Sequence, residues 1–287
     1  MPVWANVFIR FYSLISLERR KTQADKNLLL LQSHHFLSMD PLQFGGDDPG
    51  AVTLGNFINY YEFHPPEERL NLLPDNLLLD RLNRPYVFLD IGCNTGALTT
   101  RLYEKLLPSI KSKDSCLESS ENTCHMLGID IDPVLIERAH GLNTHADRIT
   151  FACLDFMSER NNEVFTQHLS QCGGRFDVIF CFSVCMWIHL NHGDDGLKRF
   201  LQDISDMAKI IVIEPQPWKC YKSAVKRLKR CHKTFPLFQN LTIREQVEQF
   251  IEDFLVTKCF FTKIHESLET KWGRKLLIFK QNQDTGR

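Results

Sequence analysis

The sequence predicts an α/β fold in which helices cover a mostly parallel β-sheet. From Pro85 onward, short apolar runs alternate with helical stretches, as in sheets whose parallel strands are joined by helices. The first apolar run ends in a glycine-containing turn that opens a helical stretch. The last two apolar runs lie close together near the C-terminus. These three observations indicate a doubly wound sheet that ends in a hairpin.

Seven apolar runs are predicted to form the strands. Five are expected to be parallel, namely 86–91, 126–130, 149–154, 176–182 and 209–213. The other two, 256–264 and 275–279, can pair as a C-terminal antiparallel hairpin. A seven-stranded sheet of this kind is the layout expected of a class I, Rossmann-like S-adenosylmethionine-dependent methyltransferase. A strand count alone does not separate that class from other doubly wound folds.

The 287 residues divide into an N-terminal extension and one methyltransferase domain. Residues 1–53 are expected to be a poorly ordered extension, and residues 54–282 the domain. Residues 1–17 are apolar, but Arg10 interrupts a stretch already shorter than the roughly 20 residues that cross a membrane. Basic residues at 19–21 leave a mitochondrial targeting helix as an alternative. Within the domain, the Ser-rich stretch 108–124 is predicted to be a solvated insertion.

Composition and cysteine usage limit the class of protein. Hydrophobic residues make up 43% and charged residues 24%, which excludes collagen-like, coiled-coil and fully disordered chains. The formal net charge of -1 gives no overall nucleic-acid signature, so a site for a polyanion must be a local patch. The ten cysteines include no CxxC pair, so no structural metal is expected. Cys93, Cys153 and Cys181 lie at or beside apolar runs, as buried free thiols do, and favour the cytoplasm or the nucleus.

The glycine turn after the first strand is the strongest local signal. It reads DIGCNTG over residues 90–96 and opens a helix expected over 97–107. Gly92 lets a ligand approach the backbone, the helix start offers free N–H groups, and Asn94 tolerates left-handed backbone angles. This order differs from the GxGxxG fingerprint of dinucleotide folds and is typical of S-adenosylmethionine binding. An ordinary tight strand-to-helix turn is the alternative.

Acidic residues end the next two predicted strands. Asp130 can accept both ribose hydroxyls of a cofactor, and Asp132 is predicted to be a helix N-cap with Pro133 at the first helical position. After the third strand, the Asp155 carboxylate can meet an adenine amino group and Phe156 can cover the base. A helix cap is the alternative role for Asp155. Because three strand ends carry suitable groups in order, the sequence predicts a cofactor site there.

Two further strings follow the fourth and fifth strands, CFSVCMWIHLNHGDDG at 181–196 and EPQPW at 214–218. With GNFINYYEFHPPEERL at 55–70 and the DIGCN turn, they resemble the bicoid-interacting-protein family of RNA 5′-phosphate methyltransferases. The resemblance covers the chain from about residue 54 to the C-terminus. Within the family, the compact domain is most similar to the branch that methylates RNA 5′-monophosphates, on microRNA precursors and histidine transfer RNA. The branch that caps 5′-triphosphate RNA is the alternative.

The resemblance implies roles for individual residues. Contacts with S-adenosyl-L-methionine are expected from the glycine turn, the strand ends and the entry segment, that is from Arg69, Asp90, Gly92, Asn94, Asp130, Asp155, Phe156 and Phe182. Tyr60 and Tyr61 would fold over the RNA 5′ end. Four residues would flank the transferred methyl group, namely His189, Glu214, Gln216 and Trp218. Phe182 replaces the methionine or leucine of relatives but keeps an apolar contact.

The implied reaction needs no catalytic base, because a terminal phosphate with a second pKa of about 6 is already anionic near neutral pH. No Ser-His-Asp or Cys-His nucleophile set is evident in the sequence. His189 is therefore expected to donate to the phosphate, with a histidine satisfied by backbone groups as the alternative. Trp187 and Trp218 could each wall the site or pack in the core. We favour Trp218 at the site, because it precedes a basic stretch.

That basic stretch, 219–233, contains seven basic residues and no acidic one. At helical spacing most of them share one face, which predicts contact with an RNA backbone. The residues expected to bind RNA are Lys219, Lys222, Lys226, Arg227 and Arg230, and a solvated helix face is the alternative. The expected partners are RNA with a 5′-monophosphate and RNA-processing proteins, with no membrane. A small-molecule or protein methyltransferase and a non-catalytic RNA-binding scaffold are the competing functions.

Overall fold

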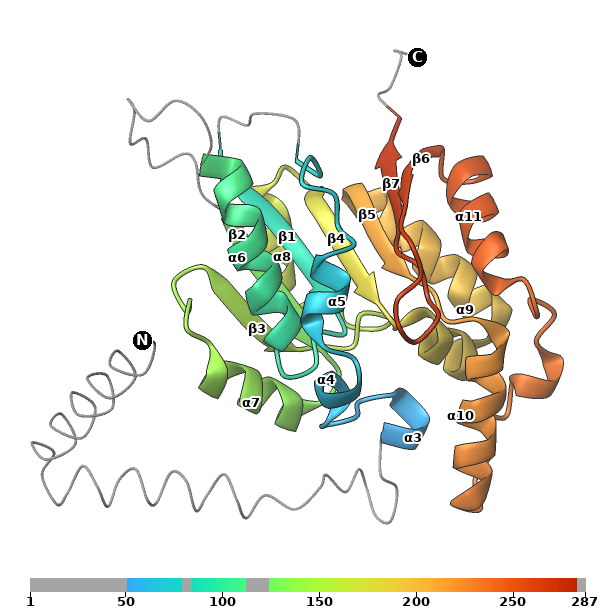
Figure 1. Ribbon diagram of the computed structural model, residues 1–287. Coiled ribbons are helices and arrows are strands. Elements are labelled where there is room, and N and C mark those ends of the chain that lie inside the picture. Colours follow the sequence, from blue (N-terminus) through green and yellow to red (C-terminus); the bar gives the residue numbers. More distant parts are fainter. Residues whose placement is uncertain (1–50, 79–83, 112–123, 283–287) are drawn as a thin grey trace, which may run out of the picture. The chain divides into compact units, whose positions relative to one another are not determined.

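The structure, a computed structural model, describes residues 51–78, 84–111 and 124–282. In these ranges seven strands form one mixed sheet in the order β3-β2-β1-β4-β5-β7-β6 (Figure 1). Five strands are parallel: β1 (Tyr86–Ile91), β2 (Cys124–Asp130), β3 (Ile149–Cys153), β4 (Phe176–Phe182) and β5 (Ala208–Glu214). Strand β7 (Leu277–Gln281) runs antiparallel to both β5 and β6 (Phe261–Glu266). This is the class I methyltransferase fold that the sequence predicts.

Helices cover both faces of the sheet. Their bounds are α3 (Ala51–Leu54), α4 (Tyr60–Phe63), α5 (Pro66–Leu70), α6 (Ala97–Lys111), α7 (Pro133–Leu142), α8 (Glu163–Gln171), α9 (Cys185–Met207), α10 (Trp218–Arg230), the 3-10 helix η1 (Phe238–Asn240) and α11 (Val247–Thr257). Helices α5, α6 and α7 pack on one face, where Leu70, Leu98 and Ile136 join a buried core. The other core includes buried residues of α8 to α11, such as Phe165, Leu190 and Ile251. The central strand β1 is buried along its whole length because both faces are covered.

Several predicted boundaries are corrected by the structure. The seventh strand, predicted at 275–279, spans Leu277–Gln281, whereas β3 ends one residue earlier than predicted and β5 is longer by one residue at each end. Residues 256 and 257 belong to α11 rather than to the sixth strand, because Phe260 has a left-handed φ of 59° and turns the chain before β6 begins at Phe261. The predicted insertion is shorter at both ends, since residues 108–111 continue α6 and Cys124 opens β2. Residues 112–123 of the insertion and residues 1–50 of the extension lie outside the described residues. Helix α3 also includes residues 51–53, which were assigned to the extension.

The carboxyl ends of the parallel strands meet at one edge of the sheet, and the segment from α3 to α4 is the first part of the described chain to reach it (Figure 1). Asp132 caps α7 as predicted, because its side chain accepts hydrogen bonds from the backbone N–H groups of Val134 and Leu135. Cys93 and Cys181 are buried, as expected for free thiols beside apolar runs. Cys153 was expected to be buried as well, but it is exposed at the end of the edge strand β3. None of the described helices is both long and apolar enough to cross a membrane.

Candidate functional site

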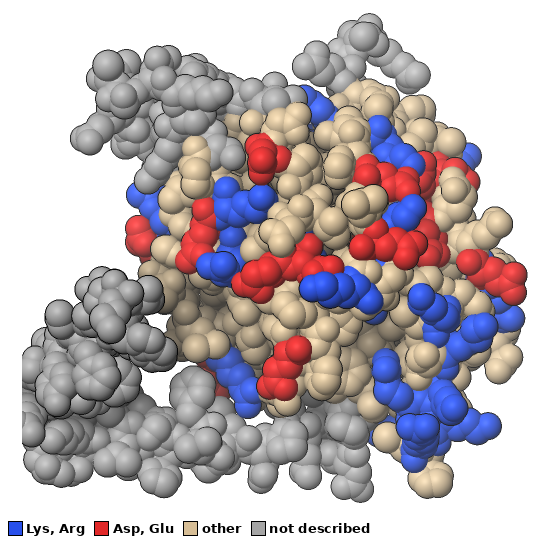
Figure 2. All heavy atoms as spheres, viewed as in Figure 1, with Lys and Arg blue, Asp and Glu red and all other residues tan. Residues whose placement is uncertain are grey.

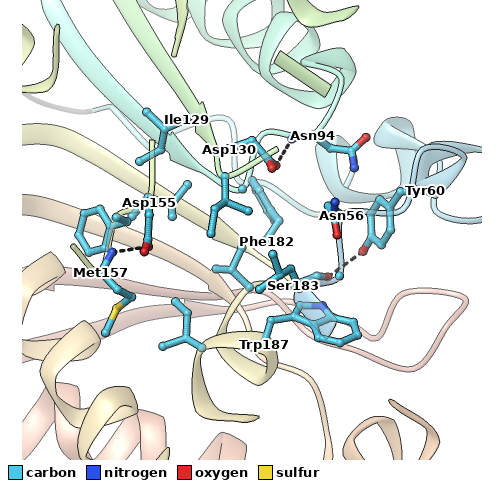
Figure 3. Close-up of a pocket in the computed structure, with 18 of the residues that line it drawn as sticks. Asn56, Tyr60, Asn94, Ile129, Asp130, Asp155, Met157, Phe182, Ser183 and Trp187 are labelled. Atoms are coloured by element: carbon cyan, nitrogen blue, oxygen red, sulfur yellow. Dashed lines mark hydrogen bonds between the residues drawn. The ribbon is translucent and has the colours of Figure 1, made fainter. Parts of the chain in front are cut away.

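A pocket that is partly open to solvent lies at the carboxyl edge of the sheet (Figure 3). Ligands of open α/β sheets commonly bind at this edge. The ends of β1 to β4, the start of α9 and the segment 54–61 supply its walls. Among the lining residues are Asn56, Tyr60, Tyr61, Arg69, Gly92, Asn94, Asp130, Asp155, Phe156, Phe182, Ser183 and Trp187. The structure therefore brings together seven of the eight residues predicted to bind the cofactor.

The turn after β1 and the acid after β2 are held together by backbone hydrogen bonds. Asn94 has a φ of 54°, and its backbone N–H donates to Asp130 Oδ2 at 2.9 Å. Asp130 Oδ1 accepts from the backbone N–H of Asp132 at 3.0 Å. Burial raises the pKa of Asp130 to about 6. A carboxylate fixed in this way keeps lone pairs that can accept the hydroxyls of a ribose.

The acid after β3 lines the pocket and also holds the turn that follows it, rather than capping a helix. Asp155 lines the pocket, and its oxygens also accept from the backbone N–H of Met157 at 2.9 Å and from Ser158 Oγ at 2.7 Å. Phe156 is buried beside it, and its ring packs edge-on against the rings of Phe165 and Phe200. Figure 3 shows Asp155 and Asn94 at opposite ends of the pocket, with Asp130 between them.

Asp90 is the one predicted cofactor residue that does not line the pocket. It is buried in β1, where its Oδ2 accepts from Thr99 Oγ1 at 2.6 Å and so ties the strand to the first turns of α6. Burial, together with the nearby Asp130 charge, raises the pKa of Asp90 to about 7. The correction follows from the side-chain alternation of a strand, which turns this residue toward the helix.

The segment between α3 and α4 contributes two pocket residues that the sequence analysis did not single out. Gly55 has a φ of 83°, and a Cβ there would lie 2.1 Å from Trp187 Nε1, so the indole needs the bare glycine backbone. Asn56 is buried, and its Nδ2 donates to Asp132 Oδ2 at 2.6 Å. Asn94 Nδ2 donates to the backbone oxygen of Phe57 at 3.0 Å. These contacts fasten the segment across the pocket.

Trp187, and not Trp218, is the tryptophan in the pocket wall. Trp218 begins α10 and packs against Phe238 with ring centroids 5.5 Å apart and against Tyr221 at 4.8 Å. This corrects the preference for Trp218. The WIHLN string carries the signal for Trp187, since this residue lies in the first turn of α9, the helix that follows β4.

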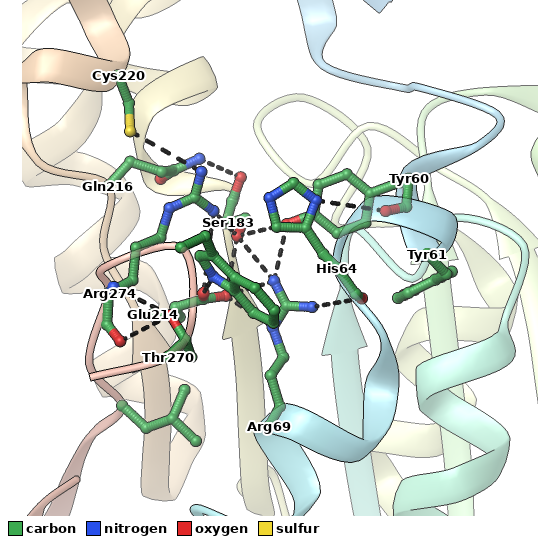
Figure 4. Close-up of polar contacts among 12 residues, drawn as sticks. Tyr60, Tyr61, His64, Arg69, Ser183, Glu214, Gln216, Cys220, Thr270 and Arg274 are labelled. Carbon is green, nitrogen blue, oxygen red and sulfur yellow. Dashed lines mark hydrogen bonds and ion pairs between the residues drawn. The ribbon is translucent and has the colours of Figure 1, made fainter. Parts of the chain in front are cut away.

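A second polar group adjoins the pocket, and we call it the arginine cluster (Figure 4). Its members are Tyr60, Arg69, Ser183, Glu214, Trp272 and Arg274. Arg69 Nε and Nη2 both lie within 2.8 Å of Glu214 Oε2, and both side chains are fully buried. Trp272 Nε1 donates to Glu214 Oε1 at 2.7 Å, and Ser183 Oγ donates to Glu214 Oε2 at 2.9 Å. Glu214 therefore holds the cluster and does not face the pocket.

Ser183 is the point where the cluster reaches the pocket. Its backbone is left-handed, with a φ of 61°, and left-handed backbone at a non-glycine residue is often found at functional sites. Ser183 Oγ accepts from Tyr60 Oη at 2.8 Å and from Arg274 Nη1 at 2.6 Å. Tyr60 Oη also accepts from Arg69 Nη2 at 2.7 Å. Tyr60, Arg69 and Ser183 all line the pocket.

The cluster carries an excess of positive charge. Two buried guanidinium groups, Arg69 and Arg274, face one carboxylate, and Arg274 Nε is buried without a hydrogen-bond partner among the described residues. His64 stacks on Tyr60, and burial together with the two arginines lowers its pKa, which disfavours a further positive charge there. Arg274 also borders a neighbouring pocket that is lined by glutamates, namely Glu248, Glu252, Glu266 and Glu269. On the side of Ser183 and Tyr60, two guanidinium groups on one carboxylate are a feature that an oxyanion would satisfy.

His189 and Gln216 are structural, which corrects their predicted place beside the methyl group. His189 is fully buried between α9 and α10, where Nδ1 lies 3.1 Å from Tyr221 Oη and Nε2 lies 2.7 Å from Asp194 Oδ1. Gln216 Oε1 accepts from the backbone N–H of Met186 at 3.1 Å, and Nε2 donates to the backbone oxygen of Ser183. Neither residue lines the pocket. The Gln216 side chain fixes the backbone at Ser183, whereas the His189 side chain ties α9 to α10.

Helix α10 presents the basic stretch at the surface, visible as the blue group at lower right in Figure 2. Six basic residues of the helix are exposed and have no ion pair within the described part of the chain, namely Lys219, Lys222, Lys226, Arg227, Lys229 and Arg230. The guanidinium of Arg227 lies 5.3 Å from the centre of the Phe57 ring, so one basic residue of the helix contacts the segment over the pocket. Lys233 lies beyond the end of the helix.

Metal chemistry has no candidate site in the described ranges, where no three His, Cys, Asp or Glu side chains gather as ligands. The strand order, the pocket at the strand ends and the acids that line it define a class I methyltransferase. A methyltransferase domain family matches residues 89–210, and the Bicoid-interacting protein 3 (Bin3) family matches residues 176–281.

The most similar relatives extend the match along the chain. An "RNA 5′-monophosphate methyltransferase" of Bos taurus is 43% identical over 246 residues, covering 83% of this chain and 84% of the bovine protein. A "Pre-miRNA 5′-monophosphate methyltransferase" of Xenopus laevis is 42% identical, covering 81% and 94%. The chain therefore belongs to the Bin3 family. Among solved structures, magnesium protoporphyrin IX methyltransferase from Synechocystis aligns with a TM-score of 0.48 at 12% identity over 88% of this chain and 94% of that one, a level that supports no conclusion about function.

Replacing Gly55 with alanine is expected to damage the pocket more than the same change at Gly173. Both glycines have left-handed φ angles, at 83° and 68°, so both changes carry a backbone cost of about 1–2 kcal/mol. Only Gly55→Ala also drives a Cβ into Trp187, whereas nothing lies within 4 Å at Gly173. We expect Gly55→Ala alone to weaken S-adenosylhomocysteine binding, measured by titration calorimetry. Equal affinities for the two variants would contradict this account of the wall.

The buried Asp90 is expected to make stability depend on pH. Its pKa is about 7 in the folded protein against 3.8 for an unperturbed aspartate, so the folded state retains a proton that the unfolded chain has lost. The free energy of unfolding contributed by this group therefore falls as the pH rises from about 4 to about 7. Asp90→Asn keeps an acceptor for Thr99 and cannot ionise. Urea unfolding should show that Asp90→Asn loses less stability than the wild type when the pH is raised from 5 to 8. Equal losses in the two proteins would refute the raised pKa of Asp90 as the cause.

Proposed function

We propose that this chain transfers the methyl group of S-adenosylmethionine to the 5′-terminal monophosphate of RNA. The observation that carries the proposal is the arginine cluster, in which two guanidinium groups share one carboxylate and of which Tyr60, Arg69 and Ser183 line the pocket. The names of the bovine and Xenopus relatives agree with this substrate. A phosphate is the anion that would supply both the charge and the acceptors.

S-adenosylmethionine supplies a methyl group on a sulfonium centre, which carries its own leaving group. Asp130 would hold the ribose, and Asp155 with Phe156 the adenine, which leaves the end of the pocket near Tyr60 and Ser183 for the phosphate. Arg69 and Arg274 would orient the phosphate oxygens, Arg274 from behind Ser183. Holding both reactants in an attack geometry can account for several kcal/mol of the barrier.

No residue need remove a proton, because a phosphomonoester with a second pKa of about 6 is mostly a dianion at neutral pH. In agreement, His189 of the 181–196 string is engaged by Tyr221 and Asp194. Glu214 is likewise committed to Arg69 and Trp272. The residues around the pocket therefore act by binding and orientation.

The finer substrate assignment extends this proposal. Precursor microRNA is suggested by the name of the Xenopus relative, and histidine transfer RNA by the family resemblance. Helix α10, with six basic residues and no acidic one, would track the RNA backbone behind the 5′ end. Free thiols such as Cys93 and Cys181 suit a reducing compartment, the cytoplasm or the nucleus.

The direct test is the transfer of labelled methyl to matched RNAs that end in a 5′-monophosphate, a 5′-triphosphate or a 5′-hydroxyl. We expect label on the monophosphate RNA only, and none with Asp130→Ala. Arg274→Gln should raise the KM for RNA about tenfold or more, because hydrogen bonds to charged groups contribute about 1.5–3 kcal/mol. It should leave S-adenosylhomocysteine affinity unchanged, since Arg274 does not line that pocket.

Other outcomes assign the chain elsewhere. Label on triphosphate RNA would place it in the capping branch. Binding of S-adenosylhomocysteine without label on any RNA would favour a small-molecule or protein substrate. If the protein binds RNA without methylating it, and Asp130→Ala does not change that binding, a non-catalytic RNA-binding scaffold would be favoured.

Helix α10 is expected to give RNA binding a steep salt dependence. Each phosphate contact that is lost lowers the slope of log affinity against log salt by about 0.7 to 0.9. Lys222→Gln should therefore weaken the binding of any RNA sequence and reduce that slope by the amount expected for one lost phosphate contact. Lys258→Gln, an exposed lysine just past α11, is the matched control and should leave the slope unchanged. Identical slopes for the two variants would leave α10 as a solvated helix face.

A further inference from the structure

Two large apolar side chains stand out at the surface. Phe63 is 74% exposed and Leu268 is 81% exposed, the highest values for large hydrophobic residues in the described ranges. Phe63 ends α4, and Leu268 lies in the loop between β6 and β7. Exposed apolar groups that the fold does not need often mark a binding surface.

Both residues belong to segments that enclose the arginine cluster. Helix α4 begins with Tyr60, whose hydroxyl bonds Arg69 and Ser183. The β6–β7 loop carries Trp272 and Arg274, which bond Glu214 and Ser183. The loop also contacts the N-terminal segments, because Lys271 pairs with Glu68 at 3.2 Å and the Trp272 ring lies 4.8 Å from that of His64.

Phe63 lies close to the cluster. Residues three apart on a helix have Cβ atoms about 5–6 Å apart, and Phe63 is three residues after Tyr60. A nucleotide whose 5′-phosphate sits at the cluster would have its base about one nucleotide length from that phosphate, and Phe63 is the exposed aromatic residue on the short helix that begins with Tyr60. Unpaired bases are commonly held by stacking on exposed aromatic side chains, which every base can do.

We propose that Phe63 is a stacking platform for the base of the first RNA nucleotide. The inference rests on the proposed function, since the phosphate at the arginine cluster sets the position of that base. Leu268 supplies further apolar surface from the β6–β7 loop. The occupant is a nucleobase of any identity, because stacking reads the flat face of a base and not its hydrogen-bonding edge.

The test measures KM and kcat for 5′-monophosphate RNA with wild-type protein, Phe63→Ala and Phe63→Trp. Phe63→Ala should raise KM about tenfold, Phe63→Trp should stay near the wild type, and S-adenosylhomocysteine affinity should be unchanged in both. Phe260→Ala is the matched control, because Phe260 is 67% exposed but lies between α11 and β6. It should leave KM unchanged.

An RNA with an abasic first nucleotide separates stacking from other effects. Wild-type protein should bind this RNA more weakly, and Phe63→Ala should add no further loss. An unchanged KM for Phe63→Ala on normal RNA would overturn the proposal, and so would an equal loss on normal and abasic RNA. Both of these results would leave the proposed function standing if the wild-type protein methylates 5′-monophosphate RNA. A wild-type protein that does not methylate this RNA would refute the proposed function itself.

Discussion

The buried ion pair between Arg69 and Glu214 is the interaction on which the site depends. Neither side chain has any exposed surface, and each would be left as an uncompensated buried charge without the other. Arg69 comes from α5 and Glu214 from the end of strand β5. Through the same carboxylate, Trp272 brings in the β6–β7 loop. One pair thus fixes three segments around the end of the pocket, and the second arginine makes that end positive.

Much of the fold could be predicted because local patterns determined it. Strands β1 and β4 have the predicted bounds, since continuous apolar runs that end at glycine or polar turns leave little ambiguity. The cap at Asp132 followed from its place before Pro133. The bounds that were missed by the most residues, at α11 and α6, lie where helix and strand patterns join without a strong break. At Phe260 a left-handed aromatic residue forms the break, and residue type alone does not signal it.

The cofactor half of the site was largely predictable, whereas the phosphate half was not. Gly92, Asn94, Asp130 and Asp155 follow strands whose ends must meet at one edge, so their positions in sequence imply their positions in space. Arg274, Ser183 and Trp187 reach the site through contacts between distant segments, and no local pattern reports them. His189 and Gln216 were misplaced for the related reason that a family string contains structural residues beside functional ones.

The contact between the β6–β7 loop and α5 also bears on how the protein folds. The backbone N–H of Lys271 donates to Glu68 across 203 residues of sequence, and Arg69 meets Glu214 across 145. Contacts of such long range form late, because the loop-closure entropy is lost before they add stability. During synthesis from the N-terminus, the strands can assemble while the arginine cluster still lacks Trp272 and Arg274. The site is then completed only when the last hairpin has joined the sheet.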